Sequence, residues 1–190
     1  SKTKNNHYVS QWLIRNFKKD GVLYRLDCKT KKIEIKSEEK LFAKRRLWSE
    51  KTEGVVGKEF DTKYAPLIRK IRTFPFESNK KDILVFHRIC DKGIAQDLNE
   101  FMDKQTIIFK TAVNLVPEAD LGMMLSAQEK DIFEVYYGIV NKEISKYTPL
   151  LLIDNPVFMD IAIKDTKEMT YELCFMFPIS ECEILVFAKN

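Results

Sequence analysis

The N-terminal fifth of the chain contains two different patterns of apolar positions. The first is a stripe at helical spacing, made of Val9, Trp12, Leu13 and Phe17. It ends in cations followed by Gly21, which is typical of a helix C-terminus. Apolar and polar residues then alternate on both sides of the turn-rich segment Asp27–Lys31, which predicts a β-hairpin. One face of this hairpin is apolar, and the other carries Arg25, Asp27, Glu34 and Lys36.

The middle of the chain has the periodicity of helices. After residues 38–50, whose pattern is ambiguous, apolar residues recur at three- and four-residue steps from Thr52 to Ile71. This spacing predicts a helix that Pro66 kinks or divides. A second helix is expected to start near Asn79 as its N-cap and to follow a stripe from Ile83 to Met102, or as far as Val116, with Gly93 as a candidate break.

A third helix is predicted between residues 126 and 144. Ser126 and Glu129 fit a capping box, and apolar residues follow at helical spacing from Ile132 to Ile144. After Pro149 the pattern changes to short apolar runs separated by turn residues, which predicts three or four strands of one sheet. These runs are 150–153, 157–163, 171–177 and 183–188.

Helices and strands are thus segregated along the chain rather than alternating, which predicts the α+β class. We expect an N-terminal helix and hairpin, a helical middle and a C-terminal, mostly antiparallel sheet. The 190 residues are long enough for one domain with its own core, so residues 1–190 are expected to form a single domain.

The charge and the cysteines limit the classes of function. The formal net charge of +4 is mild, and acidic residues are mixed with the lysines, whereas a dedicated nucleic-acid binder usually has a basic stripe. Four scattered cysteines and two histidines provide no zinc-site spacing, and they are too few for a disulfide framework. A cytoplasmic protein is therefore expected. No membrane contact is expected, because no apolar run reaches the roughly 20 residues of a membrane span and the N-terminus is polar.

The segment His7–Phe17, HYVSQWLIRNF, resembles the opening block HYVPQ-x-x-L-R-x-F of a bacterial family, domain of unknown function four-two-three-eight. Weaker similarities follow in the expected order. They are RRLWSE at 45–50, Glu59 upstream of YAPLIRKI, IDNPV at 153–157 and FPIS at 177–180. The main departure is Ser10, where relatives usually carry Pro, so the helix start is open between a position at or before His7 and a cap at Ser10. The resemblance implies no activity, because the family's function is unassigned.

The opening block also suggests a polar site. If its helix starts at or before His7, then His7, Gln11 and Arg15 share one helix face, with Tyr8 and Asn16 nearby. Histidine titrates near neutral pH, and arginine holds phosphate through its planar fork. These residue types predict a phosphodiester-cleaving or phosphate-binding site. The alternative is that this is only the solvated face of an amphipathic helix.

Two carboxylates could complete such a site. Asp154, followed by Asn155 and Pro156, is predicted to lie at a strand end, where polar side chains often face a ligand. Glu59 lies on the predicted helix 52–71. With His7 and Arg15 they could form a metal-independent acid–base centre, or the carboxylates alone could hold Mg²⁺. The alternatives are a plain turn for Asp154-Asn155-Pro156 and a surface ion pair with Lys63 for Glu59.

Arg45 and Arg46, with Trp48, form a small basic and aromatic patch that could contact a nucleic-acid strand. The alternative is a solvated loop that Trp48 anchors to the core. No Gly-rich phosphate loop, nucleophile elbow or H-E-x-x-H motif occurs, which excludes the commonest NTPase, hydrolase and zinc-protease classes.

Two hypotheses follow. The first is an enzyme that acts on nucleic acid or a nucleotide through His7, Arg15 and the carboxylates. The second is a non-catalytic binding module or inhibitor, linked to phage or mobile elements, that contacts another protein through an aromatic surface. The high phenylalanine content, 13 residues, motivates the second hypothesis.

Overall fold

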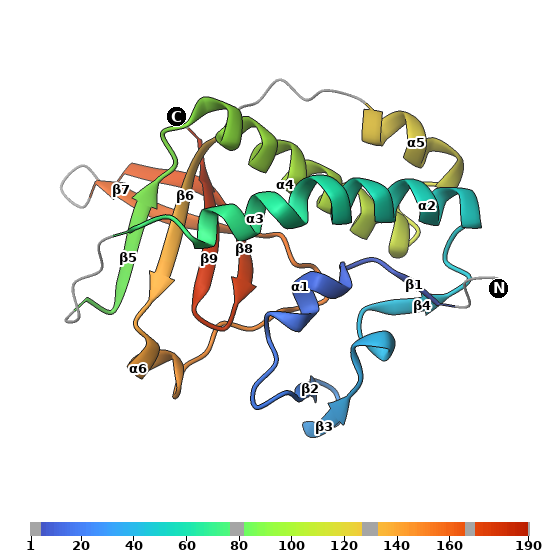
Figure 1. The fold of residues 1–190 in the computed structure, drawn as a ribbon, viewed down its shortest axis with the longest axis horizontal. Coiled ribbons are helices and arrows are strands. Elements are labelled where there is room, and N and C mark those ends of the chain that lie inside the picture. Colours follow the sequence, from blue (N-terminus) through green and yellow to red (C-terminus); the bar gives the residue numbers. More distant parts are fainter. Residues whose placement is uncertain (1–4, 77–81, 127–132, 166–169, 190) are drawn as a thin grey trace.

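The computed structural model describes residues 5–76, 82–126, 133–165 and 170–189. Two small sheets and a short helix come first, helices dominate the middle, and a five-stranded antiparallel sheet closes the chain (Figure 1). The α+β class predicted from the sequence is therefore confirmed.

The N-terminal region consists of short elements. Strand β1 (Asn5–His7) pairs with β4 (Ala43–Arg45), and helix α1 (Gln11–Arg15) follows β1. The predicted hairpin is confirmed as β2 (Leu23–Asp27) and β3 (Lys32–Lys36), and a 3-10 turn, η1 (Glu38–Lys40), comes after it. Asp27 Oδ1 stabilises the hairpin turn by accepting hydrogen bonds from the backbone N–H groups of Lys29 and Thr30.

Of the two helix starts that the sequence left open, the structure supports the one at Ser10 and contradicts the one at or before His7. His7 lies in β1 and pairs with Ala43 of β4, so its backbone is part of a sheet and not of a helix. The helix begins at Gln11 with Ser10 in the N-cap position, in extended conformation, and the Ser10 hydroxyl makes no capping hydrogen bond.

The predicted helix 52–71 is confirmed, with a division just before Pro66. It consists of α2 (Glu50–Glu59), one turn of π-helix, η2 (Phe60–Tyr64), and α3 (Ala65–Arg72). A proline cannot donate to the carbonyl four residues earlier, and its ring clashes with that carbonyl. The wider π turn accommodates both effects, so the chain stays helical through Pro66.

Two predicted helices are partly or wholly strands. The apolar run from Ile83 begins as strand β5 (Leu84–Arg88), and helix α4 (Lys92–Ala112) starts only after Asp91, whose carboxylate caps it by accepting from Ile94 N–H. Gly93 therefore lies in the first turn of α4 and does not interrupt a longer helix. Asn79, the expected cap, lies outside the described residues.

The third predicted helix is wrong as well. Ser126 ends helix α5 (Glu118–Ser126), the rest of the expected capping box lies outside the described residues, and β6 (Glu134–Val140) replaces the helix. Strand β6 has apolar residues on both faces, and spacing alone cannot distinguish such a run from a buried helix. Gly138 in β6 makes room for its cross-strand partner, because a Cβ there would lie 2.6 Å from the Phe86 ring.

The large sheet has the strand order β5-β6-β9-β8-β7, with every neighbouring pair antiparallel. Three of the predicted runs are confirmed as β7 (Phe158–Asp165), β8 (Thr170–Ser180) and β9 (Glu183–Ala188). The run Leu150–Ile153 is not a strand. It follows the short helix α6 (Lys142–Ser145) as loop, with Leu151 and Ile153 exposed.

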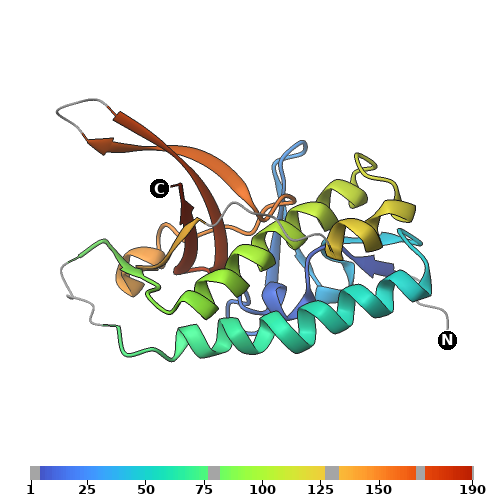
Figure 2. The same cartoon turned by 90° about the horizontal axis from the view of Figure 1, so that it is seen from above.

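The helices cover one face of this sheet. Helices α2–η2–α3 and α4 run side by side in the two views (Figures 1 and 2). The main core contains large side chains of these helices and of alternate strand residues, among them Phe60, Phe101, Leu185 and Phe187. The intervening strand residues, such as Ile184 and Val186, form a smaller cluster. No helix in the described part of the chain is both long enough and apolar enough to cross a membrane.

Candidate functional site

A groove runs between helix α1 and the helix η2–α3. It has two neighbouring lobes of about 210 Å³ and 220 Å³, which share Trp12, Arg15, Ala65 and Arg69. Asn16, Ile68 and Arg72 complete the first lobe, and Gln11 and Asp61 complete the second. Buried residues of α3, Ala65 and Ile68, form the floor of the groove. Arginine side chains line it as well.

The three arginines of the groove differ in their partners. Arg15 Nε donates to Glu38 Oε1 at 2.9 Å, and Arg72 forms a two-pronged ion pair with Glu183. Arg69, which both lobes share, is exposed and forms no hydrogen bond or ion pair with any residue that the structure describes. The groove therefore has one guanidinium free to bind an anion, between two that are held in place by carboxylates.

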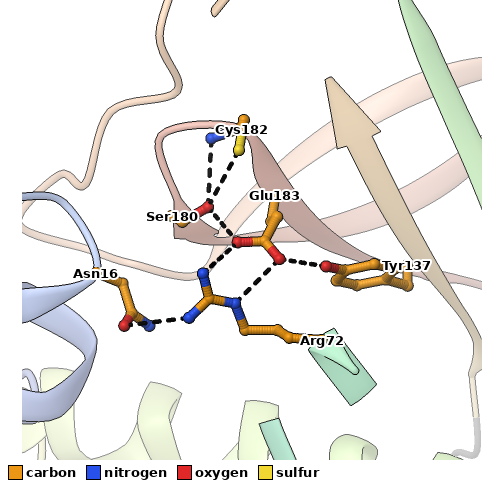
Figure 3. A network of polar contacts seen from close by, with 6 residues as sticks. All are labelled: Asn16, Arg72, Tyr137, Ser180, Cys182 and Glu183. Atoms are coloured by element: carbon orange, nitrogen blue, oxygen red, sulfur yellow. Dashed lines mark hydrogen bonds and ion pairs between the residues drawn. The ribbon is translucent and has the colours of Figure 1, made fainter. Parts of the chain in front are cut away.

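Glu183 holds Arg72 from within the sheet. Figure 3 shows Arg72 between Glu183 of β9 and Asn16 at the end of α1. Arg72 Nε lies 3.0 Å from Glu183 Oε1, Nη2 lies 2.7 Å from Oε2, and Nη1 donates to Asn16 Oδ1 at 3.4 Å. Because both carboxylate oxygens are engaged in a planar fork, the orientation of the guanidinium is fixed.

Further donors satisfy the buried Glu183 carboxylate, which is only 8% exposed. The Tyr137 hydroxyl donates to Oε1, and the Ser180 hydroxyl donates to Oε2 at 2.6 Å. Burial alone would raise the pKa of Glu183, but the hydrogen bonds from Arg72, Ser180 and Tyr137 outweigh it and hold this pKa below its usual range. Glu183 is therefore ionised at neutral pH and keeps Arg72 in position.

The opening-block residues remain connected although His7 is in a strand. His7 Nε2 lies 3.4 Å from Gln11 Nε2, and Arg15 Nη2 donates to Gln11 Oε1 at 3.4 Å. His7 Nε2 also lies 3.2 Å from the backbone carbonyl oxygen of Glu38, whose side chain binds Arg15. The structure thus brings His7, Gln11 and Arg15 together at η1, and Gln11, Arg15 and Asn16 line the groove.

Tyr8 and Asp154 interact with each other outside the groove. Burial, followed by the negative charge of Asp154, raises the pKa of Tyr8 to about 12, so this hydroxyl stays protonated. The Tyr8 ring packs against Phe42 and Phe109, and neither Tyr8 nor Asp154 lines the groove. Asp154 and Asn155 lie in a bend before β7 rather than at the end of a strand. Asn155 Oδ1 is buried and has no hydrogen-bond partner among the described residues.

Glu59 lies on the opposite side of its helix from the groove. Its carboxylate binds Lys104 of α4 at 2.5 Å, and Lys63, the partner expected from the sequence, binds Glu100 and Asp97 instead. The i, i+4 pair predicted for Glu59 and Lys63 is therefore wrong. The reason is that α4 offers both residues partners across the helix interface.

Arg45 and Arg46 are exposed around the end of β4 and do not line the groove. Trp48 is buried, with 6% of its surface exposed, and its indole N–H donates to Glu53. Trp48 therefore anchors this segment to the core, while Arg45 and Arg46 remain exposed.

Four residues of this site were not predicted from the sequence: Arg69, Arg72, Glu38 and Glu183. The signal for the two arginines was present, because they are three residues apart on the helix that carries YAPLIRKI and therefore share a face. No local signal could have found Glu183, because it meets Arg72 across 111 positions of the chain.

Among the residues whose positions are described, no group of three or more His, Cys, Asp and Glu side chains is arranged to hold a metal ion. Comparisons of the chain with models of known families, with curated proteins and with solved structures find no match. The resemblance of the opening block to a bacterial family therefore stays a prediction.

Proposed function

We propose that this protein binds the phosphate groups of a nucleic-acid strand or a nucleotide in the groove between α1 and α3. The observation that carries the proposal is Arg69, which lines both lobes and whose exposed guanidinium has no hydrogen-bond or ion-pair partner among the described residues. Arg15 and Arg72 line the same groove but are already paired with carboxylates, so Arg69 is expected to make the main charged contact with the anion.

Two further groups favour a nucleic acid or nucleotide over a simple anion. Trp12 lines both lobes, and an aromatic ring next to a phosphate contact can stack against a base. Gln11 and Asn16 supply amide groups that can hydrogen-bond a sugar or a base edge.

For phosphodiester cleavage, His7 is the residue that would move the proton. It contacts Gln11, which lines the second lobe, and histidine is the side chain that most often serves as a general acid or base in catalysis. Asp154 and Glu59 are not required in this scheme, because Asp154 lies near Tyr8 and Glu59 is paired with Lys104.

We also infer a cytoplasmic location, which the four free cysteines, two of them exposed, support.

The test is binding of short fluorescent single-stranded RNA, single-stranded DNA and nucleotides at low salt, followed by anisotropy. Arg69→Ala is expected to weaken binding about tenfold, since a charge-assisted contact to phosphate is lost. Lys70→Ala is the matched control, because it removes the same charge from the next residue, which does not line the groove. It should change affinity less than twofold.

Product analysis separates cleavage from binding. His7→Ala should abolish turnover and leave binding of the uncleaved strand intact. Absence of binding to every ligand, or equal losses in Arg69→Ala and Lys70→Ala, would show that the groove is not the binding site.

A further inference from the structure

The β2–β3 hairpin carries an apolar surface that the rest of the described chain does not cover. Tyr24 pairs across the hairpin with Ile35, and Leu26 pairs with Ile33, so the four side chains form one patch on one face. Their exposed fractions are 57% and 63% for the first pair and 51% and 70% for the second. We call these four residues the hairpin patch.

The opposite face of the hairpin meets the body of the protein only at its base, and Arg25 and Glu34 further along it are exposed. Leu23 on that face is buried, and Arg25 is close enough to Tyr8 for its charge to counteract the rise in the Tyr8 pKa. Since successive strand residues point to opposite faces, Tyr24 and Leu26 point to solvent. This reverses the usual arrangement, in which the apolar face of a two-stranded ribbon packs inward.

Figure 1 shows the hairpin beyond α1, away from helices α2–α4 and from the five-stranded sheet. An isolated two-stranded hairpin is at best marginally stable in water, and clustered apolar groups on an exposed face favour an interaction site. We propose that the hairpin patch packs against the same patch of a second copy of this chain, with the two hairpins antiparallel about a two-fold axis.

The shape of the patch fits a second copy. It is one face of a two-stranded ribbon, and two such faces can stack like the sheets of a sandwich. A two-fold axis through its centre brings the Tyr24–Ile35 pair of one copy over the Leu26–Ile33 pair of the other. Each aromatic ring then lies on an aliphatic pair rather than on another aromatic ring.

The charges at the two ends of the hairpin select the antiparallel arrangement. The tip carries Lys29, Lys31 and Lys32, and none of them forms an ion pair with any residue in the described ranges. The base carries the exposed carboxylates Asp20 and Glu39, which are neighbours in sequence of Lys19 and Lys40. Neither carboxylate forms an ion pair with a described residue. Parallel packing would place two basic tips together, whereas antiparallel packing places each tip beside the unpaired carboxylates of the other base.

The test is sedimentation velocity of the whole chain over a wide concentration range. The mass is expected to rise from 22.3 kDa toward twice that value. Ile33→Lys should weaken association about tenfold or more, because it puts a charge at the centre of the apolar contact. Ile83→Lys is the matched control, since Ile83 is similarly exposed, at 66% against 70%, and lies outside the hairpin.

Circular dichroism melting checks that both variants are folded, and neither should lose stability as a monomer, because the two side chains are exposed. A chain that stays monomeric at all concentrations, or an equal loss of association in both variants, would overturn the proposal. So would a monomer that binds acidic phospholipid vesicles or polyglutamate through Ile33, because the patch would then serve a membrane or an acidic protein partner.

Discussion

The helix formed by α2, η2 and α3 has charged residues on two sides, and the two sides differ in how completely the charges are paired. Toward α4, Lys63 and Lys104 bind Glu59, Asp97 and Glu100, and every ion pair in this set crosses or runs along the helix interface. Burial alone would raise the pKa of Glu100, but hydrogen bonds from Lys104 and Lys63 hold it at about 2. Toward α1, Arg15 and Arg72 are paired with carboxylates, whereas Arg69 has no ion-pair partner in the part of the chain that the structure describes.

This difference separates a structural ion-pair network from a binding surface. A cation that is completely paired within the protein has little left to offer a ligand, and removing it leaves carboxylates without a partner. A cation without an internal partner contributes little to folding, so its position on a groove is explained better by a ligand. Three predictions test this comparison.

Lys104→Ala is expected to have the largest effect, a loss of about 3 kcal/mol in the free energy of unfolding. Lys104 is buried, with 8% of its surface exposed, and its removal leaves Glu59 and Glu100 facing each other beside Tyr64. Arg69→Ala should change stability by less than about 0.5 kcal/mol. Urea denaturation of both variants measures the contrast, and equal losses would contradict it.

Glu183→Gln is expected to cost about 2 kcal/mol at neutral pH, because the Arg72 ion pair and a charge-assisted acceptor for Tyr137 and Ser180 are lost. The pKa of Glu183 is lower in the folded protein than its ordinary value of 4.5. Its stabilising contribution is therefore complete above that ordinary value and is lost as the pH falls through the lowered one.

The difference in unfolding free energy between the unmodified protein and Glu183→Gln should consequently shrink as the pH falls below about 4.5. Urea titrations at a series of pH values measure it. A constant difference across the acid range would mean that Glu183 acts through shape rather than charge.

Asp61→Asn is expected to have the smallest effect, a two- to threefold stronger binding of oligonucleotide. Asp61 lines the second lobe of the groove together with Arg15 and Arg69, and its negative charge opposes a phosphate there. The anisotropy assay described above measures the gain, with Glu143→Gln, an exposed residue outside the groove, as the control. Weaker binding by Asp61→Asn would indicate that the lobe accepts a cation.

Much of the fold follows from local patterns. The β2–β3 hairpin, the helix around Pro66 and the three C-terminal strands could all be predicted, because alternation, helical spacing and turn residues are encoded within a few positions. Strands β5 and β6 could not, because consecutive apolar residues, such as Leu84–Phe86 in β5 and Val135–Tyr137 in β6, hide the alternation that identifies a strand.

The groove could be predicted in part for a related reason. Gln11, Arg15 and Asn16 were found because they are close together in the sequence, and they do line the groove. Their position was predicted from a helix starting at His7, however, whereas that helix starts at Gln11. The partners that orient the arginines, Glu38 and Glu183, come from distant segments and become visible only when the chain is folded.

The π turn at Phe60–Tyr64 has a consequence for how this chain could diverge. A π turn accommodates one residue more than an α-helical turn at nearly the same total rotation, so deleting one residue there would leave α3 in phase with α2. Arg69 and Arg72 would then stay on the groove. A single-codon deletion in regular helix, between Pro66 and Arg69, would instead rotate both arginines by about 100° and is expected to abolish ligand binding more completely than any single substitution in the groove.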